Sequence, residues 1–224
     1  MQPRRRVFEG VTDLCASQLV ERRTSPHNPV LEVVRFGDRV ELNAATVNYS
    51  FGSLHRMFAA AFERLRLAER RCERALLLGV GGGSVVALLR RLPHAPRTIV
   101  AVEIDPVVVE LARTHFGLVP NEDLEIVTAD AADFVRAPHA PFDLVVVDVF
   151  VNDEIPAQCQ TPEFMRACAR LLSPGGWLVA NRMAHTPGAR AEAQAFASMC
   201  KRALGATLYL NVDDNLVLVH EATA

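Results

Sequence analysis

Four glycine-rich or acidic stretches follow apolar runs in this sequence, and their chemistry could build a pocket for a nucleotide. The first is "GVGGGS", with Gly79, Gly81, Gly82 and Gly83 leading into Ser84. Such glycines let the backbone approach a ligand, and the helix expected at Ser84 adds free N–H groups and a partial positive charge. The alternative is a tight turn from strand to helix with no ligand. Because the stretch contains no acid, we expect it to meet a negatively charged group.

The next stretch, "VEIDP", supplies two acids with different expected roles. Glu103 stands roughly 20 residues beyond Gly81, where a carboxylate can accept both hydroxyl groups of a ribose. Asp105 precedes Pro106 and is expected to cap the helix that begins there. The alternative for Glu103 is an acid that ends a strand in solvent.

Two further acids end the third and fourth apolar runs. Asp130, in "TADAADFV", could accept a hydrogen bond from an adenine amino group or cap a helix, and the spacing leaves both roles open. Asp133 is expected to be a solvated acid in the first turn of that helix. Asp148 follows three valines, so it should emerge from the core, hold an amine by charge and take its proton during attack. The alternative is a structural acid bonded to backbone N–H groups.

An alternation of apolar strands with amphipathic helices must position these residues. It predicts a parallel sheet covered on both faces, and ligands bind such sheets beyond the carboxyl ends of the strands. The final pair of strands, within 207–222, has no helix between its members, so the last strand should run antiparallel. The fold class is therefore α/β, a Rossmann-like seven-stranded methyltransferase-type sheet with a small N-terminal β-hairpin region. We expect residues 1–52 to carry the hairpin, formed by 30–45, and residues 53–224 to form the main domain.

Other candidates carry less weight. Tyr49 and His55 lie on the approach to the first long helix and could line the acceptor side, although an isolated histidine beside apolar residues is more often structural. Trp177 is expected in the core. The scattered histidines and the cysteines show no metal-ligand spacing, so we expect no metal.

Composition sets limits on the protein class. Half of the residues are hydrophobic and the formal net charge is −2, which suggests neither nucleic acid nor an anionic membrane as a partner. Glu9 and Asp13 interrupt the basic N-terminus, so it does not read as a signal peptide, and no run is apolar enough for a membrane helix. The five cysteines form no CxxC pair, and we expect them to be reduced thiols of a cytoplasmic protein.

As a set, "LLLGVGGGS", "AVEIDPVVVELA", "VTADAADFV", "FDLVVVDVF" and "TPEFMRACARLLSPGGWLV" resemble the spermidine synthase family of polyamine aminopropyltransferases. The resemblance covers roughly Ser25 to Ala180. It implies a decarboxylated S-adenosylmethionine donor, with Glu103 on the ribose, Asp130 on the adenine and Asp148 acting on the acceptor amine. It also implies a homodimer.

The sequence departs from that family at sites that bind charge. The family's glycine loop carries an acid for the donor's terminal amine, where this chain has Gly82. The family's second acid after the fourth strand is replaced by Val151, for which Asp153 or Glu154 could substitute. Leu54 stands where the family has a tyrosine.

These departures favour intact S-adenosylmethionine, because its carboxylate suits a loop that offers N–H groups and no acid. The expected function is transfer of a methyl or aminopropyl group to a small acceptor that bears an amine. One alternative is a true spermidine synthase that uses the decarboxylated donor and putrescine. Another is a non-catalytic nucleotide-binding homologue. A nicotinamide-dependent oxidoreductase is disfavoured by Ser84, which stands at the last glycine of GxGxxG.

Overall fold

Two β-sheets and six α-helices make up the described part of the chain in the computed structural model, which covers residues 17–44, 47–49, 53–151 and 154–223. Residues 1–16, where the basic N-terminus lies, and Asp153 are outside that part. The smaller sheet is antiparallel with strand order β1-β2-β3-β4. Its strands are β1 (Gln18–Arg23), β2 (Leu31–Phe36), β3 (Arg39–Ala44) and β4 (Val47–Asn48).

The predicted N-terminal hairpin is confirmed, and the structure adds a strand on either side of it. β2 and β3 pair from Leu31↔Ala44 to Phe36↔Arg39. The hairpin expected from residues 30–45 does not include β1, which pairs antiparallel with β2. Leu19 and Val20 in β1 are 48% and 38% exposed. An edge strand that buries so little has no alternation of apolar and polar residues to reveal it.

The larger sheet has seven strands in the order β10-β11-β9-β8-β5-β6-β7. The last strand, β11, lies between β10 and β9 and is antiparallel to both, which confirms the prediction. The strands are β5 (Arg74–Leu78), β6 (Thr98–Glu103), β7 (Leu124–Thr128), β8 (Phe142–Val147), β9 (Leu172–Met183), β10 (Leu208–Val212) and β11 (Asn215–Glu221). The inner strands β5 and β8 are almost wholly buried, as expected for a sheet that is covered on both faces.

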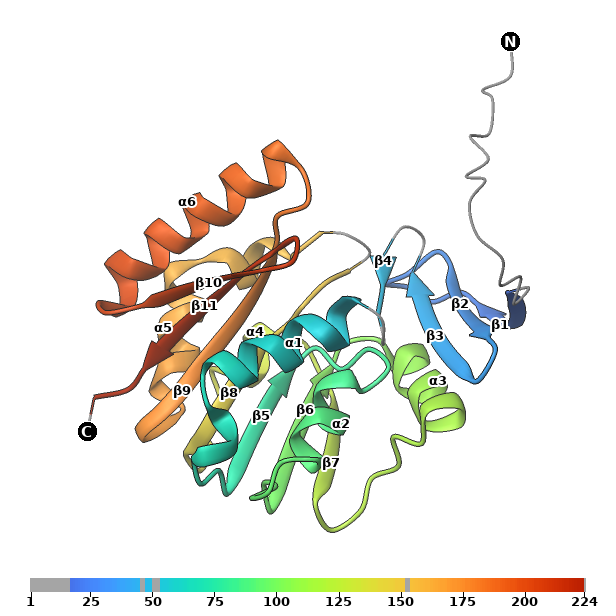
Figure 1. The fold of residues 1–224 in the computed structure, drawn as a ribbon, viewed down its shortest axis with the longest axis horizontal. Coiled ribbons are helices and arrows are strands. Elements are labelled where there is room, and N and C mark those ends of the chain that lie inside the picture. The colour runs from blue at the N-terminus through green and yellow to red at the C-terminus, as the bar shows by residue number, and fades with distance from the viewer. Residues whose placement is uncertain (1–16, 45–46, 50–52, 152–153, 224) are drawn as a thin grey trace.

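Helices cover both faces of this sheet (Figure 1). The helices are α1 (Ser53–Arg64), α2 (Ser84–Arg90), α3 (Pro106–Phe116), α4 (Ala131–Phe134), α5 (Pro162–Arg170) and α6 (Pro187–Leu204), with 3-10 turns at Leu67–Glu69 and Ala157–Gln160. Residues of α1 and α2 pack in one core, and residues of α4, α5 and α6 pack in the core on the opposite face. Trp177 is in the first core, as predicted.

A third, smaller core joins α3 to the N-terminal sheet. Val108 and Leu111 of α3 pack with Leu31 and Val33 of β2. The N-terminal sheet therefore lies beside α3, at the edge of the main sheet where β5 and its neighbours end (Figure 1). This location brings the segment that follows β4 close to the carboxyl ends of the parallel strands.

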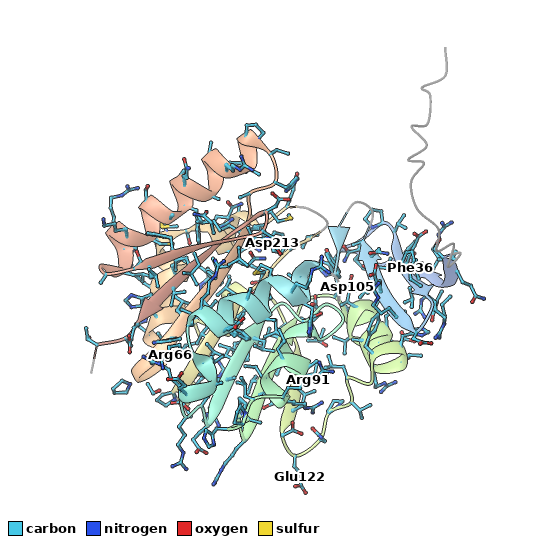
Figure 2. The ribbon with its side chains drawn as sticks, in the orientation of Figure 1. Phe36, Arg66, Arg91, Asp105, Glu122 and Asp213 are labelled. Carbon is cyan, nitrogen blue, oxygen red and sulfur yellow. The ribbon has the colours of Figure 1, made fainter. Side chains whose placement is uncertain are left out.

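Asp105 holds this junction together through a fully buried carboxylate. Its Oδ1 atom accepts a hydrogen bond of 2.9 Å from the backbone N–H of Val107, so the predicted helix cap is confirmed. Its Oδ2 atom accepts hydrogen bonds from the side chains of Asn28, at 2.7 Å, and Ser25. Figure 2 shows Asp105 where α3 meets the N-terminal sheet.

We expect Asp105→Ala to lower the free energy of unfolding by about 2–4 kcal/mol, because it removes a helix cap and leaves the buried Asn28 amide without its acceptor. Thr186→Ala is the matched control, since Thr186 caps α6 on an exposed surface and its loss should cost about 1 kcal/mol. Urea unfolding measures both. Equal losses in the two variants would contradict a role for Asp105 beyond capping.

Candidate functional site

A cavity of about 420 Å³ opens at the carboxyl ends of the parallel strands. Pockets of this size hold small organic ligands. Six of the residues predicted for the site line it: Tyr49, Gly79, Gly81, Glu103, Asp130 and Asp148. They come from the ends of four different strands and from the segment after β4. Residues far apart in the sequence therefore meet at one place.

Three other predicted residues lie outside the cavity lining. Gly82 and Gly83 are in the loop but are not among the residues that line the cavity, and His55 on α1 is also outside it. Burial, with a smaller contribution from the charge of Arg91, lowers the pKa of His55 below its ordinary value. Asp153 lies outside the described residues, and Glu154 forms an isolated bridge with Val151.

The glycine loop is shaped by close contacts with the protein's own backbone. Gly79 has φ +91°, and a Cβ atom there would lie 2.1 Å from the carbonyl oxygen of Asp148. Gly81 has φ +51°, and a Cβ atom there would lie 2.2 Å from the carbonyl oxygen of Tyr49. Both positions therefore require glycine for the fold itself, whatever ligand the loop meets.

The N–H groups of this loop also donate within the protein. Gly79 donates to the carbonyl of Val102, Gly82 to that of Tyr49 and Gly83 to that of Val80. Val80 and Gly81 donate to Oε2 of Glu103 at 3.1 and 3.5 Å. The carboxylate of a bound S-adenosylmethionine would therefore compete with these internal acceptors for the loop N–H groups. The sequence could not indicate this cost.

Glu103 is held in place by backbone groups on both sides. Besides the loop N–H groups on Oε2, the backbone N–H of Asp105 donates to Oε1 at 3.1 Å. Burial raises the pKa of Glu103, and these backbone hydrogen bonds partly oppose that rise. Each carboxylate oxygen has a second lone pair, so the oriented side chain can still accept hydroxyl groups from a ligand.

Asp130 caps a helix and also lies where it could meet a ligand, and the sequence analysis left both roles open. Its Oδ1 atom accepts from the backbone N–H groups of Ala132, at 2.7 Å, and Asp133, at 3.1 Å, so it caps α4. Its Oδ2 atom accepts from the Gln158 amide at 3.1 Å. Asp130 also lines the cavity, so capping does not remove it from reach of a ligand. Asp133 is exposed there, as expected, with 76% of its side chain accessible.

Asp148 lies at the end of β8 in an environment that favours its neutral form. Burial raises its pKa to about 6, the Asn181 hydrogen bond opposes the rise, and the charge of Glu103 adds to it. The Asn181 amide donates to Oδ1 at 2.9 Å. Within the described part of the chain, Oδ2 takes no hydrogen bond. The carboxylate is thus oriented by one oxygen and can accept a proton on the other.

Asn181 is a cavity residue that the sequence analysis missed. It is 4% exposed, and its Oδ1 atom is buried with no hydrogen-bond partner in the structure. A buried acceptor without a donor is unfavourable, so a ligand that donates a hydrogen bond would be stabilised there. A polar residue at the end of the apolar run "WLVAN" was the signal that could have identified it.

Tyr49 forms the wall of the cavity on the side of the N-terminal sheet. Its hydroxyl donates to Oδ1 of Asn28 at 3.0 Å and approaches the carbonyl of Phe150 at 3.3 Å. Its own carbonyl accepts from Gly82 at 2.9 Å. Tyr49 thus joins the N-terminal sheet, the glycine loop and the segment after β8.

The cysteines in the described part of the chain offer no reactive thiol to this site. The four that the structure describes are buried and free. Burial raises the pKa of Cys72, Cys159 and Cys200 to about 12, so these thiols stay protonated at neutral pH.

Among residues 17–44, 47–49, 53–151 and 154–223, no three His, Cys, Asp or Glu side chains gather as a metal site requires. In the same ranges no helix combines the length and apolar character needed to cross a membrane.

Comparison of the sequence and the structure with known proteins identifies relatives of one kind. The family described as "Methyltransferase domain" matches residues 76–180. A polyamine aminopropyltransferase from Vibrio vulnificus is 37% identical over 113 residues, which are 49% of this chain and 37% of that protein. One from Chromobacterium violaceum is 40% identical over 108 residues, which are 47% of this chain and 41% of that protein. The match therefore spans less than half of the length of these relatives.

The crystal structure of spermidine synthase from Thermotoga maritima superposes with a TM-score of 0.72 at 17% identity, covering 92% of this chain and 73% of that one. The strand order, with an antiparallel last strand inserted beside β9, agrees with this likeness. The chain therefore has the fold of the spermidine synthase-like class I S-adenosylmethionine-dependent methyltransferases.

Proposed function

We propose that this protein is a transferase that moves a carbon group from an S-adenosylmethionine-type sulfonium nucleotide to an amine of a small acceptor. The observation that carries the proposal is that Glu103, Asp130 and Asp148 line one cavity at the carboxyl ends of the strands. Two of these acids suit a ribose and an adenine, and the third suits an amine. The names of the relatives support the same class of reaction.

The reaction needs little covalent chemistry from the protein. The amine lone pair attacks the carbon next to the sulfonium, the carbon–sulfur bond breaks, and the thioether leaves with its electron pair. Asp148 takes the proton that the amine nitrogen loses. A pKa of about 6 makes Asp148 ionised at pH 7 and a competent general base. Asn181 orients the carboxylate for this transfer.

Different observations favour intact and decarboxylated S-adenosylmethionine as the donor. Gly82 provides no acid for the terminal amine of a decarboxylated donor, which favours intact S-adenosylmethionine. The loop N–H groups, however, already have internal acceptors, so the argument for intact S-adenosylmethionine rests on the missing acid. The polyamine aminopropyltransferases among the relatives favour the decarboxylated donor as the second candidate. Calorimetry with both donors and their thioether products distinguishes them.

We expect Glu103→Gln to weaken binding of the preferred donor by about 10- to 100-fold, because hydrogen bonds from ribose hydroxyls to a charged acceptor are lost. Calorimetry measures the affinity. Glu125→Gln is the matched control, since Glu125 is exposed on β7 and outside the cavity lining. Equal donor affinity in wild type and Glu103→Gln would contradict the assigned role. Mass spectrometry of amine acceptors with the preferred donor then tests transfer, and binding without transfer to any amine would favour the non-catalytic homologue.

A further inference from the structure

The half of the cavity beside β8 and β9 carries apolar side chains that the donor roles leave unassigned. In the strand order, β9 and β8 lie on the other side of β5 from β6, which ends at Glu103, and from β7, which Asp130 follows. Four apolar side chains line the cavity in this half, and all four are half-buried. These residues, called here the apolar lining, are Leu54 in the first turn of α1, Phe150 and Val151 after β8, and Met183 at the end of β9.

Most of the apolar lining has no role in the protein core. Within the described part of the chain, none of the three cores includes Phe150, Val151 or Met183. Leu54 packs against the first core with part of its surface. Apolar surface that stays open in a cavity is stabilised when an apolar part of a ligand covers it. The apolar lining therefore favours an apolar group on the ligand.

Tyr49 adds aromatic surface to this end of the cavity and offers no free hydroxyl hydrogen. Its hydroxyl donates to Oδ1 of Asn28 at 3.0 Å and approaches the carbonyl of Phe150 at 3.3 Å. A hydroxyl group has a single hydrogen, which is thus used within the protein. A ligand group that accepts hydrogen bonds gains nothing from Tyr49, whereas an apolar group can pack on its ring.

The polar groups at Asp148 match one primary amine. Oδ1 of Asn181 is buried without a hydrogen-bond partner in the structure, and the Asn181 amide holds Oδ1 of Asp148 at 2.9 Å. The neutral amine nitrogen that attacks has two N–H groups, one for Asp148 and one for Asn181. A single amino group thus satisfies both acceptors, and the rest of the acceptor meets the apolar lining.

Three further ionisable side chains line the cavity, and all three are exposed to solvent. They are His185, Asp213 and Asp214, and Figure 2 shows Asp213 at the tip of the β10–β11 hairpin. Ion pairs with exposed carboxylates are worth little. A charged group placed against the apolar lining would lose its hydration without gaining a buried partner. The cavity therefore discriminates against a second charge at Val151 and Met183.

Strand β9 sets the distance between the reacting amine and Met183. Asn181, which holds Asp148, and Met183 are two residues apart in β9, so their side chains lie on one face of the sheet. Two strand residues cover about 7 Å. With bonds of about 1.5 Å in a zigzag, an extended chain of about five carbons reaches that far. An acceptor of this length extends from Asp148 to Met183.

We propose that the apolar lining selects a primary alkylamine as the acceptor, with Val151 and Met183 as specificity-determining residues. This inference rests on the proposed function, which places the reacting amine at Asp148. The amino group lies at Asp148 and Asn181, and the alkyl chain covers the apolar lining. A second ammonium group on the acceptor is then a disadvantage.

A series of alkylamines tests the apolar lining in the wild-type protein. Ethylamine, propylamine, butylamine and pentylamine are compared by turnover with the preferred donor and by calorimetry in the presence of its thioether product. Each added methylene should lower KM and Kd by about fourfold. 1,4-Diaminobutane matches pentylamine in length, with an ammonium in place of the terminal methyl group. It should bind at least about tenfold more weakly than pentylamine.

Two variants change the apolar lining at different places. Met183→Ala should raise KM and Kd for pentylamine by about 10- to 100-fold and those for ethylamine much less, because the short chain does not reach Met183. Val151→Thr keeps the shape of the side chain and adds a hydroxyl, so it should weaken pentylamine binding by about 3- to 10-fold. Met199→Ala and Val119→Thr are the matched controls, since half-buried Met199 on α6 and 52% exposed Val119 are outside the cavity lining. Both should keep the wild-type dependence on chain length.

The outcomes separate the alkylamine preference from the proposed function. Binding of 1,4-diaminobutane as tightly as pentylamine, a Kd that does not change with chain length, or no binding of any alkylamine would overturn the preference. Transfer to the diamine would then leave the transferase standing. Binding that tightens with chain length and loses this dependence in Met183→Ala, without turnover of any amine, would support the preference and overturn the transferase. Equal losses for ethylamine and pentylamine in both variants would show a structural role for Met183 and Val151 and overturn their role in specificity.

Discussion

Asp148→Asn is expected to lower kcat/KM by about 10²- to 10⁴-fold, the loss that follows removal of a general base. The change is nearly isosteric, and the asparagine oxygen can still accept from the Asn181 amide at the position now 2.9 Å away. Donor affinity should stay within about twofold, because the donor contacts proposed here belong to Glu103 and Asp130. Steady-state kinetics with calorimetry of the donor separates the two effects.

The pH dependence follows from the same carboxylate. Activity of wild type should rise with pH through about 6 as Asp148 ionises, and this limb should be absent from the residual activity of the variant. Folding raises the pKa from the ordinary 3.8 to about 6, so the folded state binds more protons between these values. Stability contributed by Asp148 therefore falls as pH rises from about 4 to about 6. At pH 7 Asp148→Asn should unfold at the same temperature as wild type or higher.

Asp133→Asn is the control for this experiment, because its side chain is 76% accessible and is not part of the cavity lining. It should leave kcat/KM within about twofold, as is usual for an exposed substitution. Wild-type activity in Asp148→Asn, or a loss explained by unfolding in thermal denaturation, would refute the base assignment.

Gly79→Ala is expected to destabilise the fold by about 2–5 kcal/mol and to abolish donor binding. A non-glycine residue at φ +91° is strained, and its Cβ atom would lie 2.1 Å from the carbonyl oxygen of Asp148. Relief of that contact must move β5 or β8, and β8 carries the proposed base. Urea unfolding gives the loss of stability, and calorimetry gives donor affinity under conditions where the variant is still folded.

Gly117→Ala isolates the contribution of the backbone angle. Gly117 ends α3 at φ +66°, and a Cβ atom there would meet nothing within 4 Å. It should cost about 1–2 kcal/mol without an effect on donor binding. If Gly79→Ala costs no more than Gly117→Ala, the close approach to Asp148 is not important for stability.

The sequence predicts the main sheet well because its signals are local. Valine-rich strands, Asp105 before Pro106 and glycine after β5 each specify a nearby feature of the structure. The carboxyl-end rule for parallel sheets then places Glu103, Asp130 and Asp148 at one edge without any knowledge of their contacts. Their roles toward a ligand stay predictions.

Other parts of the site depend on contacts between distant segments. The carbonyl of Tyr49 accepts a hydrogen bond from the N–H of Gly82, which is distant along the chain, and no local pattern indicates that pairing. The Asp213–Asp214 pair reads as an ordinary turn in the sequence. It becomes part of the cavity because β11 inserts next to β9 and carries the turn to the end of that strand.

Tyr49 also limits which N-terminal sheets from related proteins could replace the one in this protein. A chimera that takes its N-terminal sheet from another protein would have to bring a carbonyl to Gly82 and an amide donor to Asp105 at the same two points. Without them, a loop N–H and a buried carboxylate would lose their partners next to the cavity. The N-terminal sheet and the main sheet are thus expected to vary together in evolution, as one inherited unit.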